Sequence, residues 1–131
     1  MESSGSELQQ RSADLALAVI KGTHTLIWFT VEVAMGWVLL AGLMKRSDRR
    51  AAAAGTVVAT ESLIFLANGA RCPLTAIAES LGAEHGSVTD TYLPKSLNRS
   101  LPAIHVPLVA LAVFLHGRNL LARHRTQTPT K

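Results

Sequence analysis

The stretch TLIWFTVEVAMGWVLLAGLM, residues 25–44, decides the fold of this chain. It contains one charged side chain, Glu32. A helix needs about 20 mostly apolar residues to cross a bilayer core of about 30 Å. Residues 51–70 also hold a single charge, Glu61, and residues 101–117 hold no Asp, Glu, Lys or Arg. The sequence therefore predicts three membrane-spanning helices, at about 22–44, 51–70 and 101–121.

A soluble helical bundle is the main alternative to a membrane protein. Soluble helices normally carry a charged face, which these segments lack. The average composition, 48% hydrophobic and 17% charged, does not separate the two classes. A cleaved signal peptide is not expected, because the N-terminus lacks a basic region and the first apolar run is too long. We expect a single all-α domain, a three-helix transmembrane bundle, with flexible tails at 1–12 and 126–131.

The basic residues of the chain predict its orientation. The net charge is +4. The connection KRSDRR, residues 45–50, has four bases and one acid, and the segment after His116 is also basic. Short basic loops stay in the cytoplasm. We therefore expect a multi-pass protein of a bacterial plasma or inner membrane, with connection 45–50 and the C-terminus inside. The N-terminus and loop 71–100 then lie outside, and no motif indicates a nucleic-acid partner.

The outer loop is expected to contain structure of its own. Cys72 and Pro73 suit the N-cap and first position of a short helix. A helix over 73–82 places several apolar side chains on one face, which is typical of an amphipathic segment on the membrane surface. These side chains are Leu74, Ile77, Ala78 and Leu81. Cys72 is the one cysteine of the chain, so it cannot form an internal disulfide.

The segment NGARCPLTAIAESLGAEHGSVTDTYLP, residues 68–94, resembles an uncharacterised group of small bacterial membrane proteins. The shared features are Arg-Cys-Pro-Leu-Thr after a span, then Gly-Ser-Val-Thr-Asp and Tyr-Leu-Pro. The resemblance implies a polytopic membrane protein with an ordered outer loop. It implies no activity.

Each predicted span carries polar residues at the same interval. The pairs Lys21/Glu32, Glu61/Cys72 and His105/His116 are each separated by 11 positions. Three helical turns take about 10.8 residues, so each pair lies on one face. Ionisable residues in a span are costly, on the order of 2.5 to 3.5 kcal/mol for Asp, Lys or Arg, and usually face the bundle interior. The candidate buried site comprises Lys21, His24, Glu32, Glu61, Asn68, Cys72 and His105.

Several roles are open for these residues. Two buried carboxylates cannot both stay charged without a partner. The polar faces could simply hold the bundle together by hydrogen bonds. They could bind haem or a transition metal, with Glu32, Glu61 and His105 as metal candidates. They could form a proton or small-solute pathway, or line a quinone or lipid pocket. The chain has no Glu-x-x-His and no Cys-x-x-Cys-His pattern.

The leading hypothesis is a non-enzymatic accessory or binding subunit with a buried Glu/His site, with or without a metal or haem. The first alternative is a proton-linked or small-solute pathway through an oligomer. The second is a membrane oxidoreductase component with Cys72 as a redox thiol. Three helices enclose little volume, so we expect a homo-oligomer or a subunit of a membrane complex in the lipid bilayer. Glu32, Glu61 and His105 are expected to converge, and His116 to lie alone toward the cytoplasm.

Overall fold

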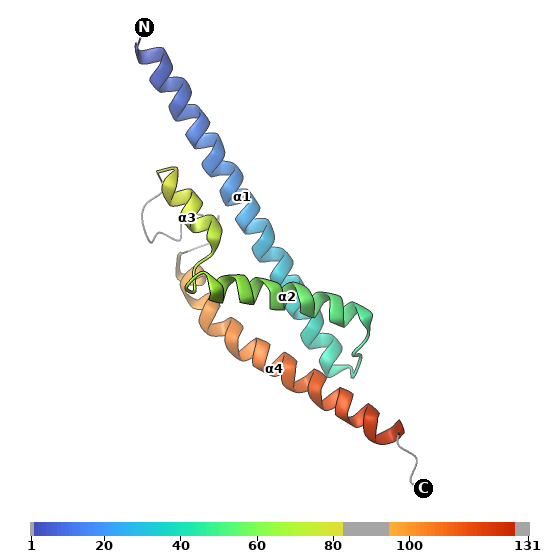
Figure 1. The fold of residues 1–131 in the computed structure, drawn as a ribbon. Helices are drawn as coiled ribbons and strands as arrows, with labels where there is room; N and C mark the ends of the chain where they lie inside the picture. The colour runs from blue at the N-terminus through green and yellow to red at the C-terminus, as the bar shows by residue number, and fades with distance from the viewer. Residues whose placement is uncertain (1, 83–94, 128–131) are drawn as a thin grey trace. The chain divides into compact units, whose positions relative to one another are not determined.

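The computed structural model describes residues 2–82 and 95–127. All the secondary-structure elements in these residues are helices. The predicted all-α class is therefore confirmed. Three segments are long and apolar enough to cross a membrane, Ser4–Leu43, Arg49–Ala67 and Pro102–Gln127. The helices are α1 (Glu2–Leu43), α2 (Arg49–Ala67), α3 (Pro73–Ser80) and α4 (Lys95–Gln127) (Figure 1).

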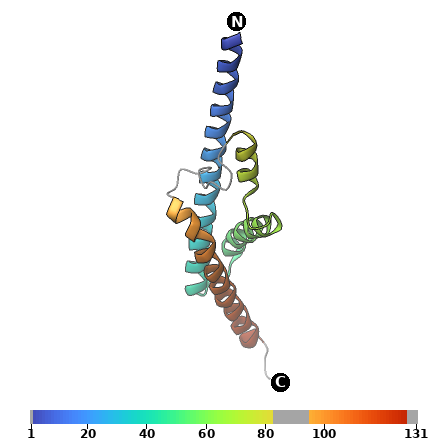
Figure 2. The ribbon, with the colours of Figure 1, turned by 90° about the vertical axis from the view of Figure 1, so that its left-hand side faces the viewer.

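Helix α1 is longer than the sequence indicated. It begins at Glu2, well before the predicted span at about 22–44, and it is unbroken in both views (Figures 1 and 2). The expected flexible tail at 1–12 is thus helical from Glu2. This segment lacks proline and β-branched residues, which favours helix. The Ser12 hydroxyl also donates to the Leu8 carbonyl at 2.7 Å, within the same helix.

Helix α4 also extends beyond its predicted limits. It begins at Lys95, before the predicted span at 101–121, and ends at Gln127, so residues 126 and 127, expected in a flexible tail, are helical. Pro102 and Pro107 both lie inside the helix. Each proline lacks an N–H, so one carbonyl in the preceding turn loses its helical donor. The Gly-Ser-Val-Thr-Asp and Tyr-Leu-Pro elements lie outside the described residues.

The chain divides into two compact units. Unit 1 comprises Met1–Phe29 and Leu63–Arg99, and unit 2 comprises Thr30–Ser62 and Ser100–Lys131. The C-terminal part of α1, most of α2 and nearly all of α4 thus belong to unit 2. Each unit is described separately below.

The core of unit 2 is built from small and medium apolar side chains. In α1 they recur every three or four residues, which places them on one face of the helix. Gly42 continues this face, and a Cβ atom at Gly42 would lie 3.0 Å from the Cβ of Leu115 on α4. The absence of a side chain at Gly42 therefore allows α1 and α4 to approach closely. The buried residues are Val31, Met35, Val38, Ala41, Ala51, Val58, Ala112 and Leu115.

A tight connection joins α1 to α2 in unit 2. Lys45 adopts a left-handed conformation (φ 57°), and the Arg46 N–H donates to the Ala41 carbonyl at 2.8 Å. This pattern is a common way to end a helix. Asp48 then begins α2, because its carboxylate accepts the Ala51 N–H at 2.9 Å. That hydrogen bond lowers the pKa of Asp48 from its ordinary value, and the nearby Arg50 contributes to the same shift.

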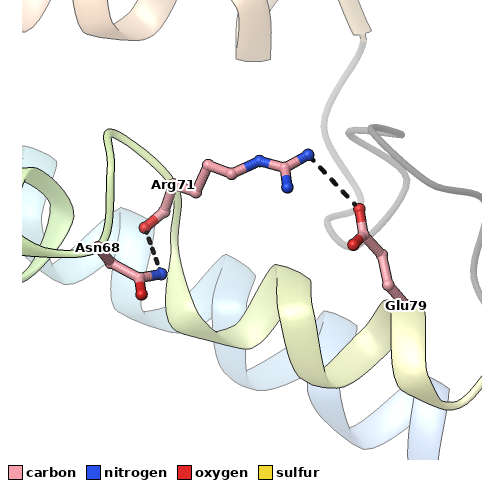
Figure 3. A network of polar contacts seen from close by, with 3 residues as sticks. All are labelled: Asn68, Arg71 and Glu79. Carbon is pink, nitrogen blue, oxygen red and sulfur yellow. Dashed lines mark hydrogen bonds and ion pairs between the residues drawn. The ribbon is translucent and has the colours of Figure 1, made fainter.

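In unit 1, the connection from α2 to α3 is fixed by side chains as well as backbone. The Asn68 amide donates to the Arg71 carbonyl at 2.9 Å (Figure 3). The Arg71 guanidinium in turn lies 3.7 Å from the Glu79 carboxylate on α3. Cys72 is the N-cap and Pro73 opens the helix, as the sequence predicts. The helix ends at Ser80, and Ala78 on its predicted apolar face is buried.

Candidate functional site

The central feature of unit 2 is a carboxylate–imidazole pair between two predicted spans. Oε1 of Glu32 on α1 lies 3.3 Å from Nδ1 of His105 on α4. Glu32 is the residue directly after Val31, which is buried in the core. His105 lies two turns before the buried Ala112 of α4. The structure therefore brings together two of the residues that the sequence nominated.

This pair can share a proton. An ionised carboxylate is only an acceptor, whereas an imidazole nitrogen donates when it carries a proton. A proton on Nδ1 of His105 therefore faces the Glu32 carboxylate. If the ring is doubly protonated, the same contact becomes an ion pair. Either arrangement offsets part of the cost of placing these groups in a spanning segment.

Glu61 does not join the pair. It is half-buried on α2 in the same unit, but it makes no hydrogen bond or ion pair with another described residue. Of the three residues expected to converge, Glu32 and His105 therefore meet and Glu61 does not. Within residues 2–82 and 95–127, no group of three or more His, Cys, Asp or Glu side chains could hold a metal ion. A metal bound by Glu32 and His105 would need additional ligands from outside the described residues.

The remaining nominated residues lie in unit 1. Lys21 and His24 are half-buried on α1. One turn after His24, the Trp28 ring meets Phe29 edge-on, with ring centroids 5.0 Å apart. Asn68 and Cys72 have local structural roles, since Asn68 closes the turn after α2 and Cys72 precedes α3. The Cys72 side chain is half-buried and makes no capping hydrogen bond to α3.

A second polar cluster in unit 2 was not anticipated. Nε2 of His116 lies 2.9 Å from the Val38 carbonyl, and Nδ1 lies 2.7 Å from the Ser47 hydroxyl. A carbonyl oxygen only accepts, so Nε2 is the donor to Val38. In the neutral ring, Nδ1 then accepts a hydrogen bond from the Ser47 hydroxyl. The expectation that His116 lies alone is wrong, because α4 packs against the end of α1.

Two more α4 residues complete this cluster. The Asn119 amide donates to the Gly42 carbonyl at 2.8 Å, and Asn119 is the one buried polar residue in the described ranges. The Arg123 guanidinium donates to the carbonyls of Ser47 and Lys45, each at 3.3 Å. We call His116, Asn119 and Arg123 the α4 clamp.

The α4 clamp donates to carbonyls in the last turns of α1 and in the connection that follows it. A sequence signal for it exists. The three residues are spaced three and four apart, which places polar side chains on one face of a helix. These side chains were not predicted to contact α1, because the segment was interpreted as the end of a span and, from its basic residues, as a cytoplasmic tail. The α4 clamp fixes two helices and the connection between them, so its role is structural.

No protein-family model, curated protein or solved structure matches this chain. Its function must therefore be inferred from the residues and contacts described above.

Proposed function

We propose that this chain is a multi-pass protein of a bacterial inner membrane that acts as a non-enzymatic accessory subunit. Its contact for a partner protein is the Glu32–His105 pair. One observation carries the proposal: the Glu32 and His105 side chains retain 28% and 21% of their exposure although both lie in spanning segments. An ionisable pair open to lipid hydrocarbon is costly. A polar group of a partner that covers the pair removes this cost.

The surroundings of the pair support a partner. Val33, which follows Glu32, is 70% exposed, and Val106, which follows His105, is 71% exposed. Of the apolar window of α2, only 11% is buried within the chain. Glu61 on α2 adds a second half-buried ionisable group with no described contact. A larger assembly would cover these surfaces and provide polar contacts for both sites.

The proposed orientation follows from the basic segments. Connection 45–50 and the C-terminus lie in the cytoplasm, and the N-terminus and loop 71–100 lie outside. The resemblance of residues 68–94 to small bacterial membrane proteins supports the assignment to a bacterial membrane.

The test is to extract the full chain from its native membrane into lipid nanodiscs and to weigh the particles by native mass spectrometry. We expect a protein mass above the 14.0 kDa of a single chain. The double variant Glu32→Leu/His105→Leu should lose this added mass. Replacing both members of a half-buried pair by apolar residues leaves no unpaired charge in the fold, so the loss would report on the partner.

The matched control is Phe114→Leu, an apolar exchange at an exposed position of the same helix. It should retain the complex. A wild-type particle of single-chain mass, or a double variant that keeps the whole complex, would contradict the proposal. A mass that is a multiple of the single chain identifies the partner as a second copy.

A second candidate, a proton-linked pathway through an oligomer, is favoured by the 3.3 Å contact between Glu32 and His105. Two protonatable groups at this separation can exchange a proton directly. In proteoliposomes, Glu32→Gln should then abolish a proton flux that the wild-type chain supports. Wild-type vesicles without any proton flux would exclude this function for the chain alone.

A further inference from the structure

We propose that the end of unit 2 formed by the α1–α2 connection and the last turns of α4 binds the phosphate headgroup of an anionic phospholipid. This basic end holds seven cationic side chains and a single acid, Asp48, so its formal charge is 7 − 1 = +6. All seven cations are exposed. They are Lys45, Arg46, Arg49, Arg50, Arg118, Arg123 and Arg125.

Hydrogen bonds bring the two basic segments together. The Arg123 guanidinium donates to the carbonyls of Lys45 and Ser47, which places α4 beside the connection. The buried bond from Asn119 to the Gly42 carbonyl holds the same two segments one turn away. The cations therefore gather at one place because the fold holds them there, although the two segments lie more than 70 positions apart in the chain.

The only acid of the basic end is already engaged. The Asp48 carboxylate accepts the Ala51 N–H at 2.9 Å and caps α2. One carboxylate cannot balance seven cations, so the cations repel one another, and a bound anion relieves this repulsion. Guanidinium groups pair with phosphate oxygens through two parallel hydrogen bonds, which makes arginine well suited to a phosphodiester. Of the five other residues in segment 45–50, all except Ser47 are basic.

The apolar neighbours of these cations favour a lipid over a nucleic acid or a soluble phosphate. Leu43 and Met44, directly before Lys45, are 64% and 54% exposed. On α4, Leu120 and Leu121 are also exposed between Arg118 and Arg123. Cations next to exposed apolar side chains at the end of spanning helices match a phosphate headgroup and its acyl chains. A nucleic acid would use the charge but not the apolar surface.

The test uses the purified full chain in detergent, with native mass spectrometry to count bound lipids. Phosphatidylglycerol and phosphatidylcholine are titrated separately. We expect phosphatidylglycerol to bind at least about tenfold more tightly, a preference equivalent to about 1.4 kcal/mol. The variant Arg49→Gln/Arg50→Gln should lose most of this preference. These two bases lie at the N-terminal end of α2, where positive charge is unfavourable, so their removal should not unfold the helix.

The matched control is Arg11→Gln/Arg71→Gln, which removes the same charge from unit 1. It should keep the preference for phosphatidylglycerol. Equal binding of the two lipids by the wild-type chain would overturn the proposal, as would an equal loss in the control variant. Complete displacement of the lipid by an equimolar amount of glycerol phosphate would identify a soluble phosphate site instead and would also overturn it.

Discussion

At the scale of single residues, the position that matters most for unit 2 is Gly42. Its carbonyl accepts the buried Asn119 amide at 2.8 Å. Its missing side chain leaves room for Leu115, whose Cβ would lie 3.0 Å from a Cβ on Gly42. Leu115 cannot relieve that contact by changing rotamer, because its Cβ is attached to the backbone. The contact between α1 and α4 therefore depends on glycine at this position.

Gly42→Ala should destabilise the protein relative to Gly36→Ala. Both substitutions gain the same helix propensity, about 1 kcal/mol. At Gly36 nothing lies within 4 Å of the added Cβ, whereas at Gly42 the helices must separate. Overpacking of this kind costs about 1–3 kcal/mol. Thermal unfolding of the two variants in the same detergent measures the difference. Equal midpoints for the two variants would show that α1 and α4 do not pack as closely as described.

At the scale of elements, the junction between α1 and α2 shows how a short polar connection can be rigid. The left-handed Lys45 ends α1 and the Asp48 carboxylate begins α2, two positions after Arg46. The Arg123 guanidinium of the α4 clamp then donates to the Lys45 and Ser47 carbonyls of this connection. The connection thus has structure beyond the charge by which it predicts orientation.

Asp48→Ala should destabilise α2 at neutral pH, and this effect should shrink in acid. The pKa of Asp48 in the folded protein lies below its ordinary value, chiefly because its carboxylate accepts the Ala51 N–H. A lowered pKa means that the stabilisation is present above the unfolded-state pKa and is lost as pH falls through the folded-state value. Thermal midpoints of the variant and the wild-type chain, compared across acidic and neutral pH, should therefore converge in acid.

Asp48→Asn is the control for this prediction. Asparagine also caps helices but does not titrate in this range. It should retain stability at neutral pH and lack the acid-dependent loss. A constant difference between Asp48→Ala and the wild-type chain at every pH would show that the carboxylate charge does not contribute.

At the scale of the whole molecule, three apolar helices place the chain among multi-pass membrane proteins. The proposed orientation can be checked with two single-cysteine variants in a Cys72→Ser background. Ser80→Cys on α3 should react with a membrane-impermeant maleimide in intact cells. Gln127→Cys at the end of α4 should react only after the cells are permeabilised. The reverse pattern would invert the orientation and move the basic end to the outer face.

The sequence by itself determined the number of spans, the all-α class and the start of α3. These features depend on apolar length and on local capping by residues such as Cys72 and Pro73, which neighbouring residues largely specify. Helical periodicity also identified a core-facing side of α1 that includes Glu32. The helical extension to Glu2 was missed, because polar composition was interpreted as a tail.

Only the tertiary structure decided which polar residues meet. Periodicity assigns a side chain to a face of its own helix, but it leaves open the level and rotation of the neighbouring helix. For this reason Glu32 could be expected to meet Glu61 as readily as His105, and the structure places only His105 against it. The α4 clamp depends on the same crossing, since His116 reaches α1 only where Gly42 lets the two helices approach.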